Sequence, residues 1–272
     1  MISTVLLSIL GVFGAVFIIV WVLAARRQKT GFPSARELAI GFVTNFFDAL
    51  GIGSFATTTS LFKLMRVVPD ENIPGTLNVG LTVPGIVEAF IFISIVSVDP
   101  TTLILLCIAA VAGAWLGSAV VARWPRRNIQ IGMGTALLIA ATLFTLSNLK
   151  LFPAGGTALA LQGASLWFAV AVNFCLGALM TLGIGLFAPC MIMVSLLGMN
   201  PIAAFPIMMS STAFLMPVAS TRFIQADRYS LRPALGLTLA GIPAVLIAAF
   251  VVKSLPLTTL RWLVVAVVLY TA

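Results

Sequence analysis

Two short segments of this chain place glycines and polar side chains inside sequence that is otherwise strongly apolar. The first reads Gly51-Ile52-Gly53-Ser54-Phe55-Ala56 and the second Gly183-Ile184-Gly185-Leu186-Phe187-Ala188, so five of six positions are identical at an offset of 132 residues. Glycine disfavours a helix interior, and a helix broken inside a membrane leaves N–H groups that protein, water or ligand must satisfy. The half-helices beginning at Ser54 and Leu186 would direct partial positive charge at the breaks, which predicts a small anion-binding site.

Polar side chains near the breaks extend this predicted site. Pro189 falls in the first turn of its half-helix, where a missing N–H costs little. Asn78 and Ser210-Ser211-Thr212 follow Pro74 and Pro206, which are also 132 residues apart. The predicted substrate-binding residues are Gly51, Gly53, Ser54, Thr57, Thr58, Thr59, Asn78, Gly183, Gly185, Leu186, Pro189, Cys190, Ser210, Ser211 and Thr212.

Simpler interpretations of these residues stay open. The glycines can serve close helix packing, and the hydroxyls and amides can serve ordinary hydrogen bonds between membrane helices. Cys190 can contact a sulfur-containing ligand or act as a small buried apolar group. Two matched copies inside overlong apolar runs favour a functional break over packing alone.

Asp48 and Glu88 are the only carboxylates deep within apolar runs. A carboxylate inside a membrane is costly and indicates an ion or proton pathway, so both are candidates for proton coupling. The alternative is a neutral or snorkelling acid with a structural role. The apolar runs contain no deep Arg or Lys, so dipoles, hydroxyls and amides would have to hold an anion. The chain has no histidine, and we predict no metal, no cofactor and no catalytic residue.

Composition determines the class of protein that carries these residues. The chain has 272 residues, of which 61% are hydrophobic and 8% charged, with a mean hydropathy of +1.18. Soluble domains are about 25% charged, so we expect an all-α integral membrane protein with a polytopic helical bundle. The net charge of +8 comes from short basic clusters between apolar runs. This pattern indicates orientation in a lipid bilayer and no binding of nucleic acid.

The lengths of the apolar runs predict how the chain is divided. Residues 1–35 form an additional N-terminal transmembrane helix with its N-terminus outside, residues 36–150 a first transmembrane repeat, and residues 151–272 a second. A continuous helix over residues 37–64 would measure about 42 Å, against a hydrocarbon core of about 30 Å. A break at Gly51–Gly53 would instead give two short helices that enter and leave the membrane on the same side.

Basic residues favour this re-entrant arrangement. If every run crosses the membrane once, eight Lys and Arg residues lie inside and seven outside. If both broken runs re-enter, twelve lie inside and only Lys150, Lys253 and Arg261 lie outside. The second distribution fits the positive-inside rule. It also gives the two repeats opposite orientations, which is the inverted-repeat plan of many secondary transporters.

The glycine-broken segments, together with Pro189 and the run Ala112-Gly113-Ala114-Trp115-Leu116-Gly117, resemble the TauE/SafE family of sulfite exporters. The resemblance covers about residues 36–272. Ser54 after Gly53, Leu186 after Gly185 and Thr57 in place of a more typical proline depart from the family pattern. The resemblance implies movement of small sulfur-containing or organic anions, such as sulfite and sulfonates, across the bacterial inner membrane.

We therefore expect a secondary transporter that exports a small anion by alternating access, with protons as a candidate coupling ion. A passive anion channel would contain the same broken helices. A membrane-embedded enzyme is the remaining alternative, and it lacks histidine and a metal-ligand cluster in this sequence. Substrate, stoichiometry and oligomeric state do not follow from the sequence.

Overall fold

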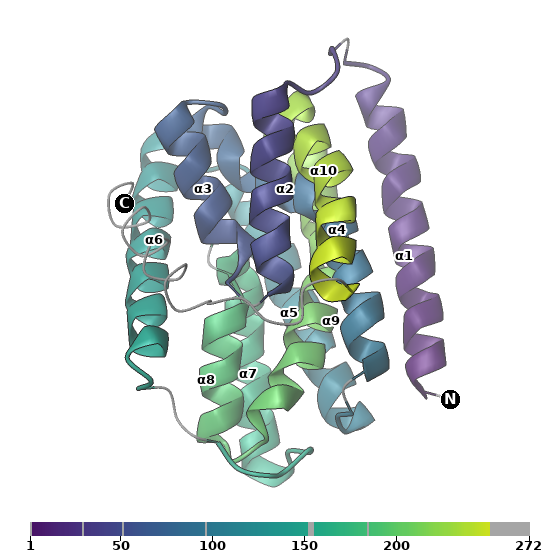
Figure 1. Cartoon of the computed structure of the whole chain (residues 1–272), viewed down its shortest axis with the longest axis vertical. Helices are drawn as coiled ribbons and strands as arrows, with labels where there is room; N and C mark the ends of the chain where they lie inside the picture. Colours follow the sequence, from purple (N-terminus) through teal and green to yellow (C-terminus); the bar gives the residue numbers. More distant parts are fainter. Residues whose placement is uncertain are drawn as a thin grey trace.

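The computed structural model describes residues 2–28, 30–50, 52–95, 97–151, 155–183 and 185–250 (Figure 1). These residues are mostly helical, and no β-strand occurs among them. The predicted last apolar run, residues 258–272, lies outside the described part, as do Gly51 and Ile184. The helices are α1 (Ile2–Ala25), α2 (Ala35–Ala49), α3 (Ser54–Met65), α4 (Ile73–Ile95), α5 (Pro100–Val121), α6 (Arg126–Asn148), α7 (Gly163–Met180), α8 (Phe187–Leu196), α9 (Ala204–Gln225) and α10 (Leu231–Phe250), with 3-10 turns η1 (Asp70–Asn72) and η2 (Pro201–Ala203).

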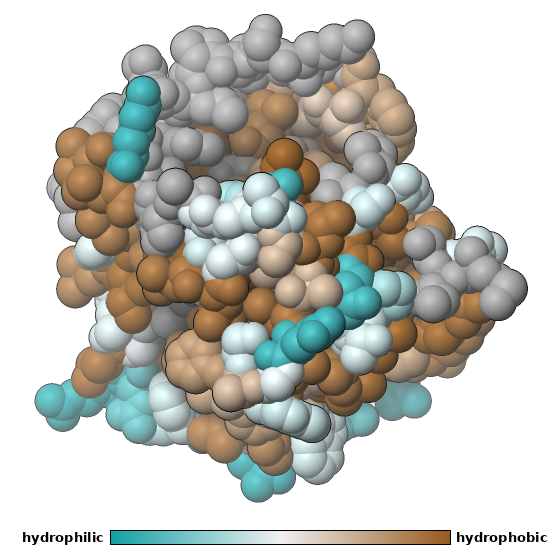
Figure 2. Space-filling view, turned by 90° about the horizontal axis from the view of Figure 1, so that it is seen from below, coloured by the Kyte–Doolittle hydropathy of each residue, from teal (hydrophilic) through white to brown (hydrophobic). Residues whose placement is uncertain are grey.

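Within the described residues, six helices are long and apolar enough to cross a membrane: α1, α4, α5, α7, α9 and α10. Large apolar side chains also lie exposed on the surface of the molecule. Seen from below, brown apolar side chains cover much of the surface (Figure 2). The predicted all-α polytopic membrane protein is therefore confirmed.

Helices α4 and α9 pack against each other at the centre of the bundle. Their spans are 72% and 78% buried, whereas only 22% of the α1 span is buried, so α1 is a peripheral helix. Figure 1 shows α1 at one edge of the bundle. Any site inside the bundle is therefore expected to include side chains of α4 and α9.

The described halves of the chain repeat one order of elements. The series α2, α3, η1, α4, α5 is followed, after α6, by the corresponding series α7, α8, η2, α9, α10. The first helix of each series packs along the last helix of the other series: α2 packs along α10, and α7 packs along α5. In Figure 1, the α2–α3 hairpin occupies the upper half of the bundle and the α7–α8 hairpin the lower half.

The two exchanged helix pairs approach closely through glycine. A Cβ on Gly41 of α2 would lie 2.5 Å from the carbonyl oxygen of Gly236 on α10. A Cβ on Gly113 of α5 would collide with the carbonyl of Phe174 on α7. Small residues allow membrane helices to pack backbone against backbone, so these contacts hold each hairpin to the opposite half.

Most of the described basic side chains lie in loops or in the first and last turns of helices at one end of the molecule. The ends of α1, α3, α5 and α9 and the starts of α2, α6 and α10 lie at the upper end of Figure 1, and Lys150 follows α6 at the other. Hydrogen bonds connect these upper loops, from Gln28 to Asp227 and from Arg232 to the Phe32 carbonyl. The described residues follow the charge distribution expected for re-entrant hairpins, and Lys253 and Arg261, which were predicted at the other end, lie outside the described part of the chain.

Candidate functional site

The first predicted break is present in the structure. Helix α2 ends at Ala49, the Ile52 N–H donates to the Phe47 carbonyl at 3.0 Å, and α3 begins at Ser54. Gly53 lies between the two helices with φ +88°, a backbone conformation that favours glycine. The chain then reverses direction, so the start of α3 lies beside the end of α2 (Figure 1).

The second break is also present and differs in detail. Helix α7 ends at Met180 and Gly183 has φ +105°. Helix α8 begins at Phe187, so the predicted start at Leu186 is wrong by one residue. Leu186 is the N-cap and supplies no side-chain hydrogen bond, since leucine has no acceptor. Pro189 lies in the first turn of α8, as predicted.

A small cavity of about 40 Å³ lies between the two breaks. Gly53 and Ser54 from the first break and Gly185 and Leu186 from the second line it, and Thr212 of α9 completes the set of predicted binding residues that it brings together. Asp48 and Glu88 line the same cavity. Residues far apart in the sequence thus meet at one place in the core.

Asp48 already occupies the anion position predicted at the start of α3. Its Oδ1 accepts a hydrogen bond from the Ser54 N–H at 2.9 Å, and its Oδ2 accepts one from the Ser54 hydroxyl at 2.6 Å. A carboxylate at a helix N-terminus is favourable because it faces the positive end of the helix dipole. The Ser54 amide and hydroxyl, which were predicted to hold the substrate anion, therefore bind Asp48 in this structure.

Glu88 is the second acid in the cavity and is 2% exposed. Its Oε1 has no hydrogen-bond partner. Burial of an ionised carboxylate oxygen without a partner is costly, so Glu88 is the less favourable of the two acids to carry the negative charge. No basic residue lines the cavity, whose described walls carry acids, hydroxyls and apolar groups.

The threonines of α3 divide into two groups. The Thr57 hydroxyl bonds to the carbonyls of Gly53 and Ser54 within its own helix. Thr58 and Thr59 are buried with hydroxyls that have no partner. The Thr59 hydroxyl lies 3.7 Å from the position a Cβ would take on Gly183, so it faces the second break. None of the three lines the cavity itself.

Other predicted site residues lie in the helix interfaces, away from the cavity. Asn78 donates to the Pro74 carbonyl at 2.8 Å. Ser211 accepts from Asn173 at 3.1 Å, in a contact between α9 and α7. Ser210 is buried with an unpartnered hydroxyl, and Cys190 is fully buried in the apolar core. Ser211 thus has the interhelical bond that the simpler interpretation expected, whereas the Asn78 bond lies within α4 and leaves its Oδ1 without a partner.

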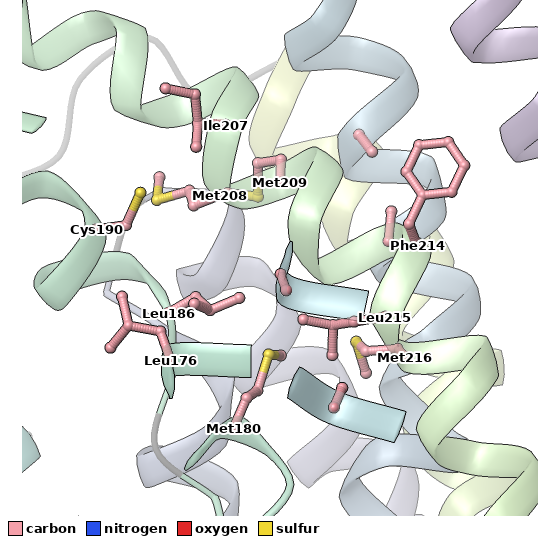
Figure 3. Packing of buried hydrophobic residues seen from close by; sticks show 14 of the residues in the cluster. Leu176, Met180, Leu186, Cys190, Ile207, Met208, Met209, Phe214, Leu215 and Met216 are labelled. Atoms are coloured by element: carbon pink, nitrogen blue, oxygen red, sulfur yellow. The ribbon is translucent and has the colours of Figure 1, made fainter. Parts of the chain in front are cut away.

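Several cavity-lining residues were not predicted from the sequence. They are mostly apolar, and the flexible thioether side chains among them can repack around a changing space. Figure 3 shows methionines from α7 and α9 near Leu186 in the core. Helices α4 and α9 supply five of these additional residues, and the remaining three come from α3, α7 and α8. The additional residues are Phe55, Leu81, Gly85, Met180, Phe187, Met208, Met209 and Met216.

Comparison with known proteins identifies one family. A family model described as Sulfite exporter TauE/SafE matches residues 1–144, more than half of the chain. The matched region includes α1, which the resemblance noted from the motifs had left outside, and it ends before the second break. No curated protein and no solved structure gives a significant match. The chain therefore belongs to the TauE/SafE family, a family of membrane transporters described as sulfite exporters.

Proposed function

We propose that this protein exports a small anion, of the sulfite or sulfonate class, by alternating access around the cavity between the two breaks. The observation that supports this most is the meeting of both glycine breaks with α4 and α9 at one internal cavity. Broken helices at the interface of two repeats are a common site for substrates and coupling ions in secondary transporters.

Helix α8 supports the anion assignment. Its first turn starts at the cavity through Leu186 and Phe187, and its N-cap residue offers no side-chain acceptor. An unsatisfied helix N-terminus presents N–H donors and partial positive charge, which suit an oxyanion. The Thr59 hydroxyl, buried and unpartnered beside Gly183, is a further donor within reach of this break.

The size of the cavity supports an alternating mechanism over an open pore. A volume of about 40 Å³ leaves room for little more than water, which fits a closed state of a carrier better than an open pore. Opening then requires one hairpin to move relative to α4 and α9. The opposed hairpins of Figure 1 support two repeats of inverted orientation, with the basic end inside and the N-terminus outside.

Transport in proteoliposomes tests this proposal against the channel alternative. Purified protein should show saturable uptake of radiolabelled sulfite, and unlabelled sulfite loaded inside the vesicles should accelerate that uptake by counterflow. Thiosulfate, sulfoacetate and simple carboxylates, added as competitors, would rank the substrates. A flux that rises without saturation and shows no counterflow would contradict the carrier and support a passive channel.

A further inference from the structure

Asp48 differs from an ordinary helix cap in its position. It lies in α2, before the break, and reaches across to Ser54 at the start of the next helix. Asp99 caps α5 in the usual way: it is itself the N-cap residue, and it accepts from the Thr102 N–H at 2.8 Å and the Thr102 hydroxyl at 2.9 Å. Because Asp48 belongs to the other arm of the hairpin, its contact can be broken without unwinding α3.

The cavity provides little room for a second negative charge. Asp48 and Glu88 both line it, none of its described lining residues is basic, and its volume is about 40 Å³. Two like charges in such a space strongly disfavour each other, so one of the two acids has to carry a proton. Asp48 has two hydrogen bonds from Ser54, whereas the Glu88 Oε1 has none, so the charge belongs on Asp48.

We infer that Asp48 is a tethered anion that occupies the start of α3 and gives way to the transported anion only when it takes up a proton. This inference rests on the proposed anion transport. Protonation converts the Asp48 carboxylate into a neutral carboxyl, which weakens its bonds to the Ser54 amide and hydroxyl. The transported anion then accepts the same donors, and the net charge at the break stays the same. One proton accordingly enters with each singly charged anion.

This exchange predicts how anion affinity depends on pH. Above the pH at which Asp48 ionises, each unit of increase should lower the affinity for methanesulfonate by about tenfold, because binding requires one proton. Below that pH the affinity should be constant. Methanesulfonate is a suitable probe because its own charge does not change over this range.

Two substitutions identify the group responsible. Asp48→Asn keeps an acceptor for Ser54 and removes the charge, so its affinity should be independent of pH and equal to that of the wild-type protein at low pH. Asp99→Asn makes the same change at a cap of similar geometry that does not line the cavity, and it should retain the tenfold dependence. Glu88→Gln should retain it as well, since the group that occupies the start of α3 is Asp48.

A measurement on the wild-type protein avoids any effect of substitution on folding. Methanesulfonate binding, followed by calorimetry in buffers of different ionisation enthalpy, should take up about one proton per anion at neutral pH. Affinity without pH dependence, a dependence that survives in Asp48→Asn, or a requirement for sodium in place of protons would overturn the role of Asp48. If neither methanesulfonate nor sulfite binds at any pH, the proposed function itself fails.

Discussion

At the scale of residues, the two matched glycine segments are less alike in structure than in sequence. Gly53 has φ +88°, whereas its counterpart Gly185 lies outside the left-handed region, where Gly183 is found instead. A Cβ on Gly185 would meet only the Phe55 Cβ, at 4.0 Å. The backbone at Gly53 therefore requires glycine, whereas the backbone at the matched Gly185 can accept a larger residue.

Alanine substitutions should reveal this difference in stability. Gly53→Ala should lower the free energy of unfolding by about 1 to 2 kcal/mol, because a Cβ is strained at positive φ. Gly185→Ala should leave stability nearly unchanged, since both space and backbone permit a methyl group. Thermal unfolding of the two detergent-solubilised variants would compare them, and equal melting temperatures would contradict this account of the first break.

The sequence predicted Asp48 as a deep carboxylate without predicting its partner. Hydropathy marks an acid inside an apolar run, but the hydrogen bonds to Ser54 depend on the chain folding back at Gly53. The methionines of the cavity carried no signal at all, because a methionine in an apolar helix is expected wherever it faces. The sequence therefore identified the acid, which is unusual in an apolar run, but not the methionines that line the cavity around it.

At the scale of elements, run length and glycine spacing were sufficient to predict both breaks. A run too long for one crossing had to be interrupted, and the glycines gave the position within one residue at α8. The partners of the resulting hairpins were not predictable in the same way. The pairing of α2 with α10 and of α7 with α5 joins segments from opposite halves of the chain.

Glycine contacts should be essential in both of these helix pairs. Gly41→Leu and Gly113→Leu each place a side chain against the backbone of the facing helix, so each should destabilise the protein by on the order of 3 kcal/mol. Gly11→Leu is the control, because a Cβ there meets only the Phe90 ring at 3.7 Å on the peripheral helix α1. Thermal unfolding monitored by size-exclusion chromatography would measure all three, and a stable Gly113→Leu protein would refute the close packing of α5 on α7.

At the scale of the whole molecule, the described halves exchange helices around a central pair and bring their breaks to one cavity. The family match, the apolar spans and the basic loops at one end fit a transporter in a membrane. The sequence predicted two repeats with matched breaks through duplication and run length, but not the exchange of helices between the halves. It did not predict that an acid of the chain itself occupies one of the two helix ends, which makes the start of α8 the more accessible anion contact.

The central claim is that the transported anion passes between the two breaks. A negative charge introduced beside the start of α8 tests this claim most directly. Gly185→Asp adds a carboxylate at the cavity wall, and Gly185→Asn adds an amide of nearly the same size. Repulsion of a like charge costs several kcal/mol, so sulfite counterflow in proteoliposomes should fall at least about tenfold further in the aspartate variant than in the asparagine variant. Equal counterflow in two folded variants would show that the anion does not pass between the two breaks.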